Sequence, residues 1–145
     1  MSLICFFNKY QDFGYQRISR DTLKKEILNQ VIIKEQNLYL WDSWYKILPR
    51  KTIDWIIKTY VDRTPPRADE YDCDDYALRM YAWVKLHYKG NVTLGRAVIP
   101  AQTPDKPSHK LNIVYSDEET LYFIEPQKPG LELITPGQEL LFLEM

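Results

Sequence analysis

The spacing of apolar residues changes near Gly90, and this change constrains the fold more than any other feature of the sequence. Before Gly90, apolar residues recur every three or four positions, which is the spacing of helices with one buried face. After it, short apolar runs are separated by turn residues, which is typical of strands. Helices followed by hairpin-connected strands predict an α+β fold. We therefore expect N-terminal helices, and a later helix packed on an antiparallel β-sheet.

Three segments carry the helical spacing. The first follows Ser19, which can cap a helix N-terminus, and the second follows Pro49. Paired prolines in residues 64–70 predict a loop between the second and third helices. The expected helices cover about 20–33, a segment from a capping Thr52 to about 61, and about 71–90, where Gly90 would be the C-terminal cap.

The other segments have the patterns of strands or extended chain. Residues 1–18 are expected to form a strand or an irregular arm, and the aromatic-rich segment over 38–48 is expected to be a strand or extended chain. A proline-rich loop over 100–108 and a turn over 116–119 separate the strands. The expected strands cover residues 92–99, 109–115, 120–125, 131–134 and 140–143.

Length and composition indicate one ordinary globular domain over residues 1–145. The aromatic fraction of 14% is high, and such rings build cores but also stack on sugars, bases and peptides. The net charge of −1, with no block of basic residues, argues against a nucleic-acid partner. Whether the chain forms a homo-oligomer is left open by the sequence.

The N-terminal apolar run Leu3–Phe7 is too short for the core of a signal peptide or for a membrane span. The sequence therefore predicts a cytoplasmic protein without a membrane partner, or one released by another route, and association with a phage or its host is open. The two cysteines, Cys5 and Cys73, do not make a disulfide scaffold, although one bridge between them is not excluded.

Cys73 falls in the first turn of the third expected helix. A thiol attacks as its thiolate, and a helix N-terminus favours that form through partial positive charge and free N–H groups. A single cysteine on an amphipathic helix is nevertheless more often a small buried apolar residue. Cys73 alone therefore does not predict a reactive site.

Two later residues could complete such a site. His109 begins a strand after the 100–108 loop and could act as a general base, whereas His87 lies late in a helix, where its cation suits the C-terminus. Glu125 ends the next strand, where its carboxylate could orient the imidazole of His109. Gln127 is a second candidate for that role, or an oxyanion donor. The simpler alternatives are a solvated histidine and a strand-terminal carboxylate pointing into water.

Three short motifs carry a resemblance to a known group. Residues 72–77 (DCDDYA), 109–112 (HKLN) and 124–127 (IEPQ) resemble the C-D-D-[FY]-A, H-x-x-N and E-P-Q pattern of a papain-fold group. This transglutaminase-like group includes the C-terminal domain of the Marasmius oreades agglutinin type and small bacterial and phage proteins. The resemblance covers residues 40–130 and implies a papain-like fold with a Cys-His-Glu triad.

The same resemblance implies a role for each residue and a metal. Cys73 would be the nucleophile, His109 the base and Glu125 the orienting acid of a calcium-dependent cysteine protease. No lectin activity is implied, because the sugar-binding β-trefoil of the agglutinin is absent from this sequence. Lys110 stands after His109 where a small residue is expected, which affects access to the base.

Acidic residues crowd the cysteine. Carboxylates in the first turn of a helix ordinarily complement its dipole, which is the simpler explanation. So much negative charge opposes formation of a thiolate, however, unless a cation neutralises it. Calcium prefers such oxygen ligands. The sequence therefore names Asp72, Asp74 and Asp75 as candidate metal ligands.

Two functions are compatible with these observations. The first is a cysteine-dependent peptidase, amidase or transglutaminase acting on a peptide or protein substrate, with calcium but no other cofactor. The second is a non-catalytic binding or structural module on the same fold, for example one associated with a phage. The three motifs make the first the main interpretation, whereas the aromatic excess and the acidic crowding around Cys73 support the second as the alternative.

Overall fold

The computed structural model describes residues 15–60, 72–101, 103–104, 107–127 and 130–145. Residues 1–14 of the expected arm and the loop over 64–70 lie outside these residues, and the end of the arm enters the strand β1 (Arg17–Ser19). Within them the fold is α+β, as predicted, with three α-helices and a mostly antiparallel sheet. The helices are α1 (Arg20–Gln30), α2 (Arg50–Thr59) and α3 (Cys73–His87), and a 3-10 turn spans Glu35–Asn37.

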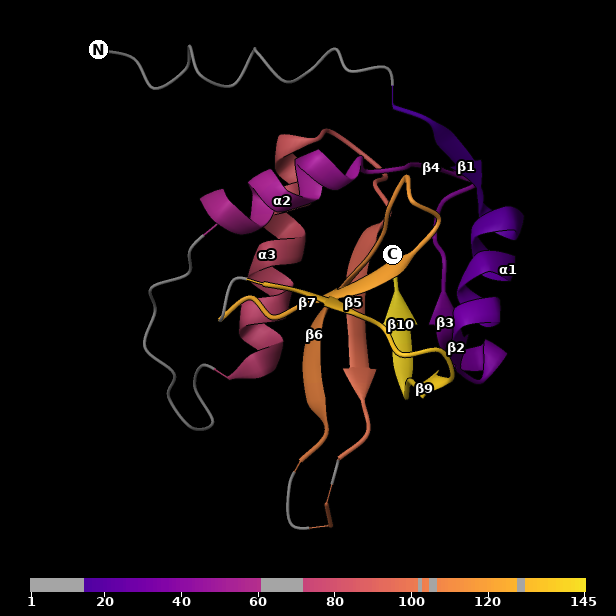
Figure 1. Cartoon of the computed structure of the whole chain (residues 1–145), viewed down its shortest axis with the longest axis vertical. Helices are drawn as coiled ribbons and strands as arrows, with labels where there is room; N and C mark the ends of the chain where they lie inside the picture. Colours follow the sequence, from indigo (N-terminus) through magenta and orange to yellow (C-terminus); the bar gives the residue numbers. More distant parts are fainter. Residues whose placement is uncertain (1–14, 61–71, 102, 105–106, 128–129) are drawn as a thin grey trace.

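The main sheet has six strands in the order β3-β10-β5-β6-β7-β8. All neighbours are antiparallel except β3 and β10, which are parallel. Figure 1 shows α2 and α3 on one side of this sheet and α1 on the other. The strands are β3 (Leu38–Tyr39), β5 (Leu94–Ile99), β6 (His109–Tyr115), β7 (Leu121–Ile124), β8 (Leu131–Leu133) and β10 (Phe142–Glu144).

Two small two-stranded sheets accompany the main sheet, one within the N-terminal part of the chain and one that joins this part to the C-terminal part. β1 (Arg17–Ser19) pairs antiparallel with β4 (Trp44–Lys46). β2 (Val31–Ile32) pairs parallel with β9 (Gln138–Glu139). The aromatic-rich segment 38–48 is therefore not one continuous strand: β3 joins the main sheet, and β4 turns away to pair with β1.

Several helix ends differ from their predicted positions. α1, expected to reach about residue 33, ends at Gln30, and Val31–Ile32 form the strand β2. α2 begins directly after Pro49, which is its N-cap, so Thr52 lies inside the helix and does not cap it. The reason is that proline fixes φ near the helical value, so the chain enters the helix at once. α3 ends at His87 with Tyr88 as its cap, and Gly90 follows with a φ of 129° in the connection to β5.

The core lies on both faces of the main sheet. Ile113 packs in the cluster that contains Leu23 of α1, and the next residue, Val114, packs in the cluster that contains Met80 of α3. Strands buried on both faces read as continuous apolar runs, which explains why β6 and β7 lack alternation in the sequence.

Asn112 fixes α3 to the sheet. It is fully buried in β6, and its side-chain amide donates to the carbonyl oxygens of Ala77 in α3, at 2.9 Å, and Gly95 in β5, at 3.1 Å. A buried amide bonded to two elements fixes their relative position. The N-terminus of α3, with Cys73, is thereby held near the start of β6.

No helix in the part of the chain that the structure describes is both long and apolar enough to cross a membrane.

Candidate functional site

Cys73 is the first residue of α3, and its start is set by a capping box. The side chain of Asp72 accepts from the backbone N–H of Asp74 at 3.1 Å, and that of Asp75 accepts from the backbone N–H of Asp72 at 3.2 Å. The thiol is free and half-buried, and its Sγ accepts from the backbone N–H of Lys110 at 3.5 Å. Cys73 therefore lies against the first residues of β6.

His109 and Glu125 form a close pair next to Lys110, the residue whose backbone contacts the thiol. The register of β6 and β7 brings Glu125 opposite Leu111, two residues from His109 and on the same face. Nε2 of His109 and Oε2 of Glu125 are 2.6 Å apart. This hydrogen bond raises the pKa of His109, against the opposing effect of partial burial. Within the described residues, no hydrogen bond joins the imidazole to the thiol.

Gln127 contributes to this cluster through its backbone. Its N–H donates to Oε1 of Glu125 at 3.2 Å, and the side chain is exposed. The structure therefore brings three of the four predicted residues, Cys73, His109 and Glu125, to one region, with the backbone of Gln127 holding the carboxylate.

The three predicted metal ligands already have partners in the protein. Asp72 and Asp75 accept the backbone bonds of the capping box, and Asp74 forms an ion pair with Lys110 at 2.7 Å. Hydrogen bonding to Asp72 and then to Lys110 lowers the pKa of Asp74. Oxygens of the three carboxylates lie within 4.8 Å of one another. The ammonium of Lys110 neutralises part of their negative charge, a role that was predicted for a bound calcium ion.

A cavity opens beside this region, between α3 and the sheet. Its volume is about 390 Å³, and Asp74, Ala77 and Lys110 line one side of it. Arg96 and Phe142 line the other side, from β5 and β10.

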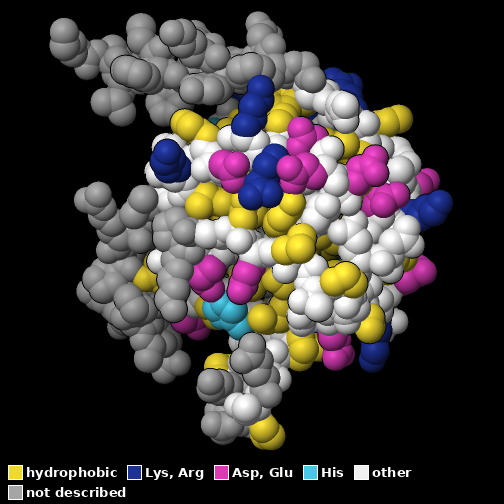
Figure 2. Space-filling model, in the orientation of Figure 1, with side chains coloured by type: hydrophobic (Ala, Val, Ile, Leu, Met, Phe, Trp, Pro, Cys, Tyr) yellow, Lys and Arg dark blue, Asp and Glu magenta, His cyan; other side chains and the backbone are white. Residues whose placement is uncertain are grey.

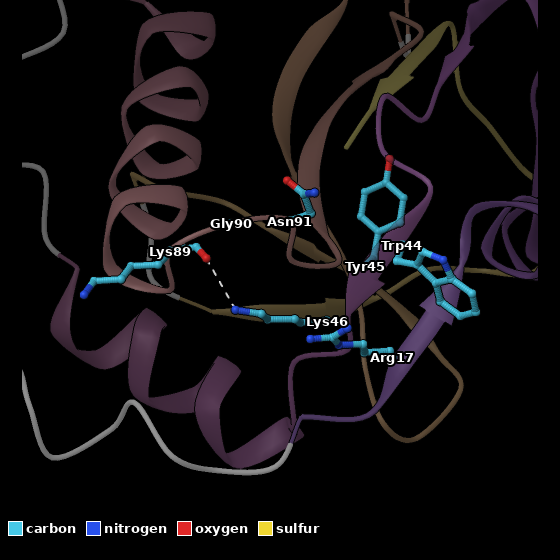
Figure 3. A pocket seen from close by; sticks show the side chains of 7 residues that line it. All are labelled: Arg17, Trp44, Tyr45, Lys46, Lys89, Gly90 and Asn91. Atoms are coloured by element: carbon cyan, nitrogen blue, oxygen red, sulfur yellow. Dashed lines mark hydrogen bonds between the residues drawn. The ribbon is translucent and has the colours of Figure 1, made fainter.

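A second cavity, which we call the Trp44 pocket, lies at the other end of α3 (Figure 3). Its volume is about 250 Å³. The register of β1 and β4 pairs Arg17 with Lys46, and Trp44 projects from the same face two residues before Lys46. The connection from α3 to β5 closes it. Its lining residues are Arg17, Trp44, Tyr45, Lys46, Lys89, Gly90 and Asn91.

Sequence reasoning missed the Trp44 pocket because three distant segments form it. The alternation of Trp44, Tyr45 and Lys46 indicates a strand with one buried and one exposed face, but it does not reveal the partner strand. The pairing with Arg17 requires the fold.

Positive and negative side chains are mixed on one face of the molecule. On the face drawn in Figure 2, Lys and Arg side chains are scattered among Asp and Glu and form no basic stripe. The expectation that the chain has no nucleic-acid footprint stays a prediction.

Comparisons with known proteins give a structural likeness only. No family model and no curated protein matches the sequence. A structure of PSL1a in complex with E64 matches with a TM-score of 0.70 and 21% identity, over 89% of this chain and 50% of that one. Polyporus squamosus lectin, bound to the influenza-binding epitope Neu5Acα2-6Galβ1-4GlcNAc, matches with a TM-score of 0.58 and 22% identity, over 74% of this chain and 42% of that one.

This chain therefore spans about half the length of the solved structures it matches. At these identities the likeness shows the fold.

The comparisons correct the functional interpretation made from the three motifs. The matching structures are lectins, so the interpretation as a cysteine peptidase, amidase or transglutaminase with a peptide or protein substrate is wrong, and a non-catalytic binding module is better supported. The comparisons likewise do not support the protease that the resemblance to the Marasmius agglutinin type implied. The fold gives Asp72 and Asp75 a structural role, because they form the capping box of α3.

Proposed function

We propose that this chain is a carbohydrate-binding module and that its ligand enters the Trp44 pocket. The observation that carries the proposal is the indole of Trp44, 58% exposed, at the rim of a hollow lined by N–H donors from three segments. Saccharide sites combine an aromatic face, which packs on the apolar side of a sugar ring, with polar groups that bond its hydroxyls. The lectin-like fold supports this function. Because the matched chains are about twice as long, the site is argued from this chain's own residues.

The strand that carries Trp44 is held rigidly. Tyr45 is almost fully buried; its hydroxyl donates to the carbonyl of Met145 at 3.3 Å and accepts from the N–H of Asp42 at 3.0 Å. Backbone bonds on the opposite edge join Lys46 to Asn91 and Thr93. A ring presented by an ordered strand loses little conformational entropy on binding a ligand.

Trp41 provides the matched comparison. It is 67% exposed, like Trp44, but its ring stacks on Tyr39 at 5.6 Å and it lines neither of the two cavities described above. An exposed indole alone is therefore not sufficient for the proposed site, and the surrounding donors distinguish Trp44.

A glycan array followed by calorimetry tests the proposal. We expect the protein to retain a saccharide with a Kd below about 1 mM, and Trp44→Ala to weaken binding at least about tenfold. Trp41→Ala should leave the affinity within about twofold. If no glycan is retained, or if both substitutions weaken binding equally, the Trp44 pocket is not the site.

A second candidate site is the thiol cluster. We propose that Cys73, His109 and Glu125, with the backbone of Gln127, form a reactive-thiol site. Its neighbours Asp74 and Lys110 line the 390 Å³ cavity. The 2.6 Å pair of His109 and Glu125 and the contact of Lys110 N–H with the thiol support it. We also propose that the α+β fold is a single papain-like, transglutaminase-like domain, in which α3 packs on β5 and β6. The rate at which iodoacetamide alkylates Cys73 tests whether this thiol is reactive.

Calcium at the acidic cluster is a separate proposal, and it fits only in part. Calcium takes six to eight oxygen ligands, whereas the described residues offer three carboxylates that are already bonded. A melting curve with calcium and with a chelator tests it, since a bound ion must raise the melting temperature. Cytoplasmic location and association with a phage or host stay predictions.

A further inference from the structure

The Trp44 pocket concentrates positive charge. Three of its seven lining residues are cationic and none is acidic. Figure 3 shows the side chain of Lys89 pointing away from the other two, so the positive charge at the pocket comes from Arg17 and Lys46. Within the described residues Arg17 forms no ion pair. This differs from the mixed charges on the face drawn in Figure 2.

Arg17 and Lys46 are direct cross-strand partners of β1 and β4. Their side chains lie on one face of the pair, next to each other in Figure 3. Like charges directly opposite on antiparallel strands are destabilising, and an anion between them removes the repulsion. The arrangement is therefore one that a negatively charged group would stabilise.

The ammonium of Lys46 is fixed in position. Its Nζ donates to the carbonyl oxygens of Tyr88 and Lys89, at 3.4 Å each, where α3 ends. A lysine ammonium has three N–H donors, so Lys46 keeps one donor for a ligand after these two bonds. Arg17 brings a planar guanidinium, which suits a carboxylate or sulfate bound through two oxygens.

We propose that the Trp44 pocket selects saccharides that carry an acid group, with Arg17 and Lys46 holding the carboxylate or sulfate and Trp44 packing on the sugar ring. This inference rests on the proposed carbohydrate-binding function and names its ligand class. Trp44 and Arg17 are diagonal neighbours across the strand pair, a separation that aromatic and long side chains span. A ring and its acid substituent can therefore be bound together.

Titration calorimetry with three probes tests the inference: Neu5Acα2-6Galβ1-4GlcNAc, 6-O-sulfated Galβ1-4GlcNAc and neutral Galβ1-4GlcNAc. We expect at least one acidic probe to bind about tenfold more tightly than the neutral one, with a preference that weakens as salt is raised. The two acidic probes distinguish a carboxylate from a sulfate. Arg17→Gln should abolish the preference, Arg17→Lys should retain part of it, and Lys25→Gln, which removes an exposed charge elsewhere, should not change it.

The outcomes separate this inference from the function on which it rests. Equal affinity for acidic and neutral probes, with binding lost in Trp44→Ala, would overturn the acid preference and leave carbohydrate binding in place. Absence of binding by all three probes and by the glycan array would overturn both. An acid preference that survives Arg17→Gln would exclude the assigned residues.

Discussion

Nε2 of His109 and Oε2 of Glu125 lie 2.6 Å apart, although 16 residues separate them in the chain. The β6–β7 hairpin brings the two residues together. The hydrogen bond to Glu125 is the largest influence on the pKa of His109, which it raises.

The first prediction concerns the protonation of His109. The carboxylate of Glu125 raises the pKa of His109 above its ordinary value, so Glu125→Gln should lower it. Imidazole proton shifts followed by NMR across pH measure the change. An unchanged pKa in Glu125→Gln would show that the pair does not form in solution.

The same shift has a defined sign for stability. Because the folded pKa is raised, the pair stabilises the fold fully below the unfolded pKa of about 6.5, and this contribution is lost as pH rises through the folded pKa. The side chains are 39% and 27% exposed, so solvent screening keeps the effect small.

The second prediction concerns the thiol of Cys73. In the proposed reactive-thiol site His109 is the base that takes the thiol proton, so His109→Gln should slow alkylation by iodoacetamide at neutral pH by roughly fivefold. The measurement uses a Cys5→Ser background so that only Cys73 reacts. His87→Gln, at the only other histidine in the sequence, is the matched control and should alkylate at the original rate. Equal rates for all three proteins would remove His109 from the thiol site.

The third prediction concerns a buried hydroxyl. Oγ1 of Thr93 donates to the carbonyl of Tyr115 at 2.6 Å and accepts from the N–H of Leu48 at 3.2 Å. Thr93→Val keeps the shape but leaves two buried backbone groups unsatisfied, so the free energy of unfolding should fall by about 2–3 kcal/mol. Urea unfolding measures this free energy. The control is Thr135→Val at an exposed site, which should change the free energy of unfolding by less than about 0.5 kcal/mol. Similar losses at both sites would contradict the assigned bonds.

The fourth prediction concerns Gly95 in β5. A Cβ at this position would collide with the backbone carbonyl of Glu144 and with the side chain of Met145. Since the obstacle is largely backbone, Gly95→Ala should destabilise the protein by about 3 kcal/mol or more. Gly137→Ala meets no atom within 4 Å, so it should cost only the strain of its φ of 82°, about 1 kcal/mol. Thermal melting of both variants compares them, and a larger loss at Gly137 would contradict the packing of β10 on β5.

The sequence predicted the elements whose pattern is local. The strand over 109–115 was predicted with its observed bounds, and the third helix was placed with Cys73 in its first turn, where the capping box of Asp72 and Asp75 sets its start. The turn over 116–119 was also found, because it joins neighbouring strands.

Features that depend on distant segments were not predicted. The parallel pairs β2–β9 and β3–β10 join residues about a hundred positions apart, and nothing in either short segment specifies its partner. The Trp44 pocket was missed for the same reason. The peptidase function was inferred from three motifs that lie at a helix start and at two strand ends, and the comparisons contradict that function, whereas the site residues themselves stay a prediction.

The position of β10 in the main sheet has a consequence for how the protein is made. β10 lies between β3 and β5, so residues 142–144 join two strands that leave the ribosome much earlier. Until these residues emerge, one edge each of β3 and β5 is without its final partner, and unpaired strand edges are sites of aggregation. The nascent chain therefore depends on β10 to fill the gap between β3 and β5 and complete the sheet.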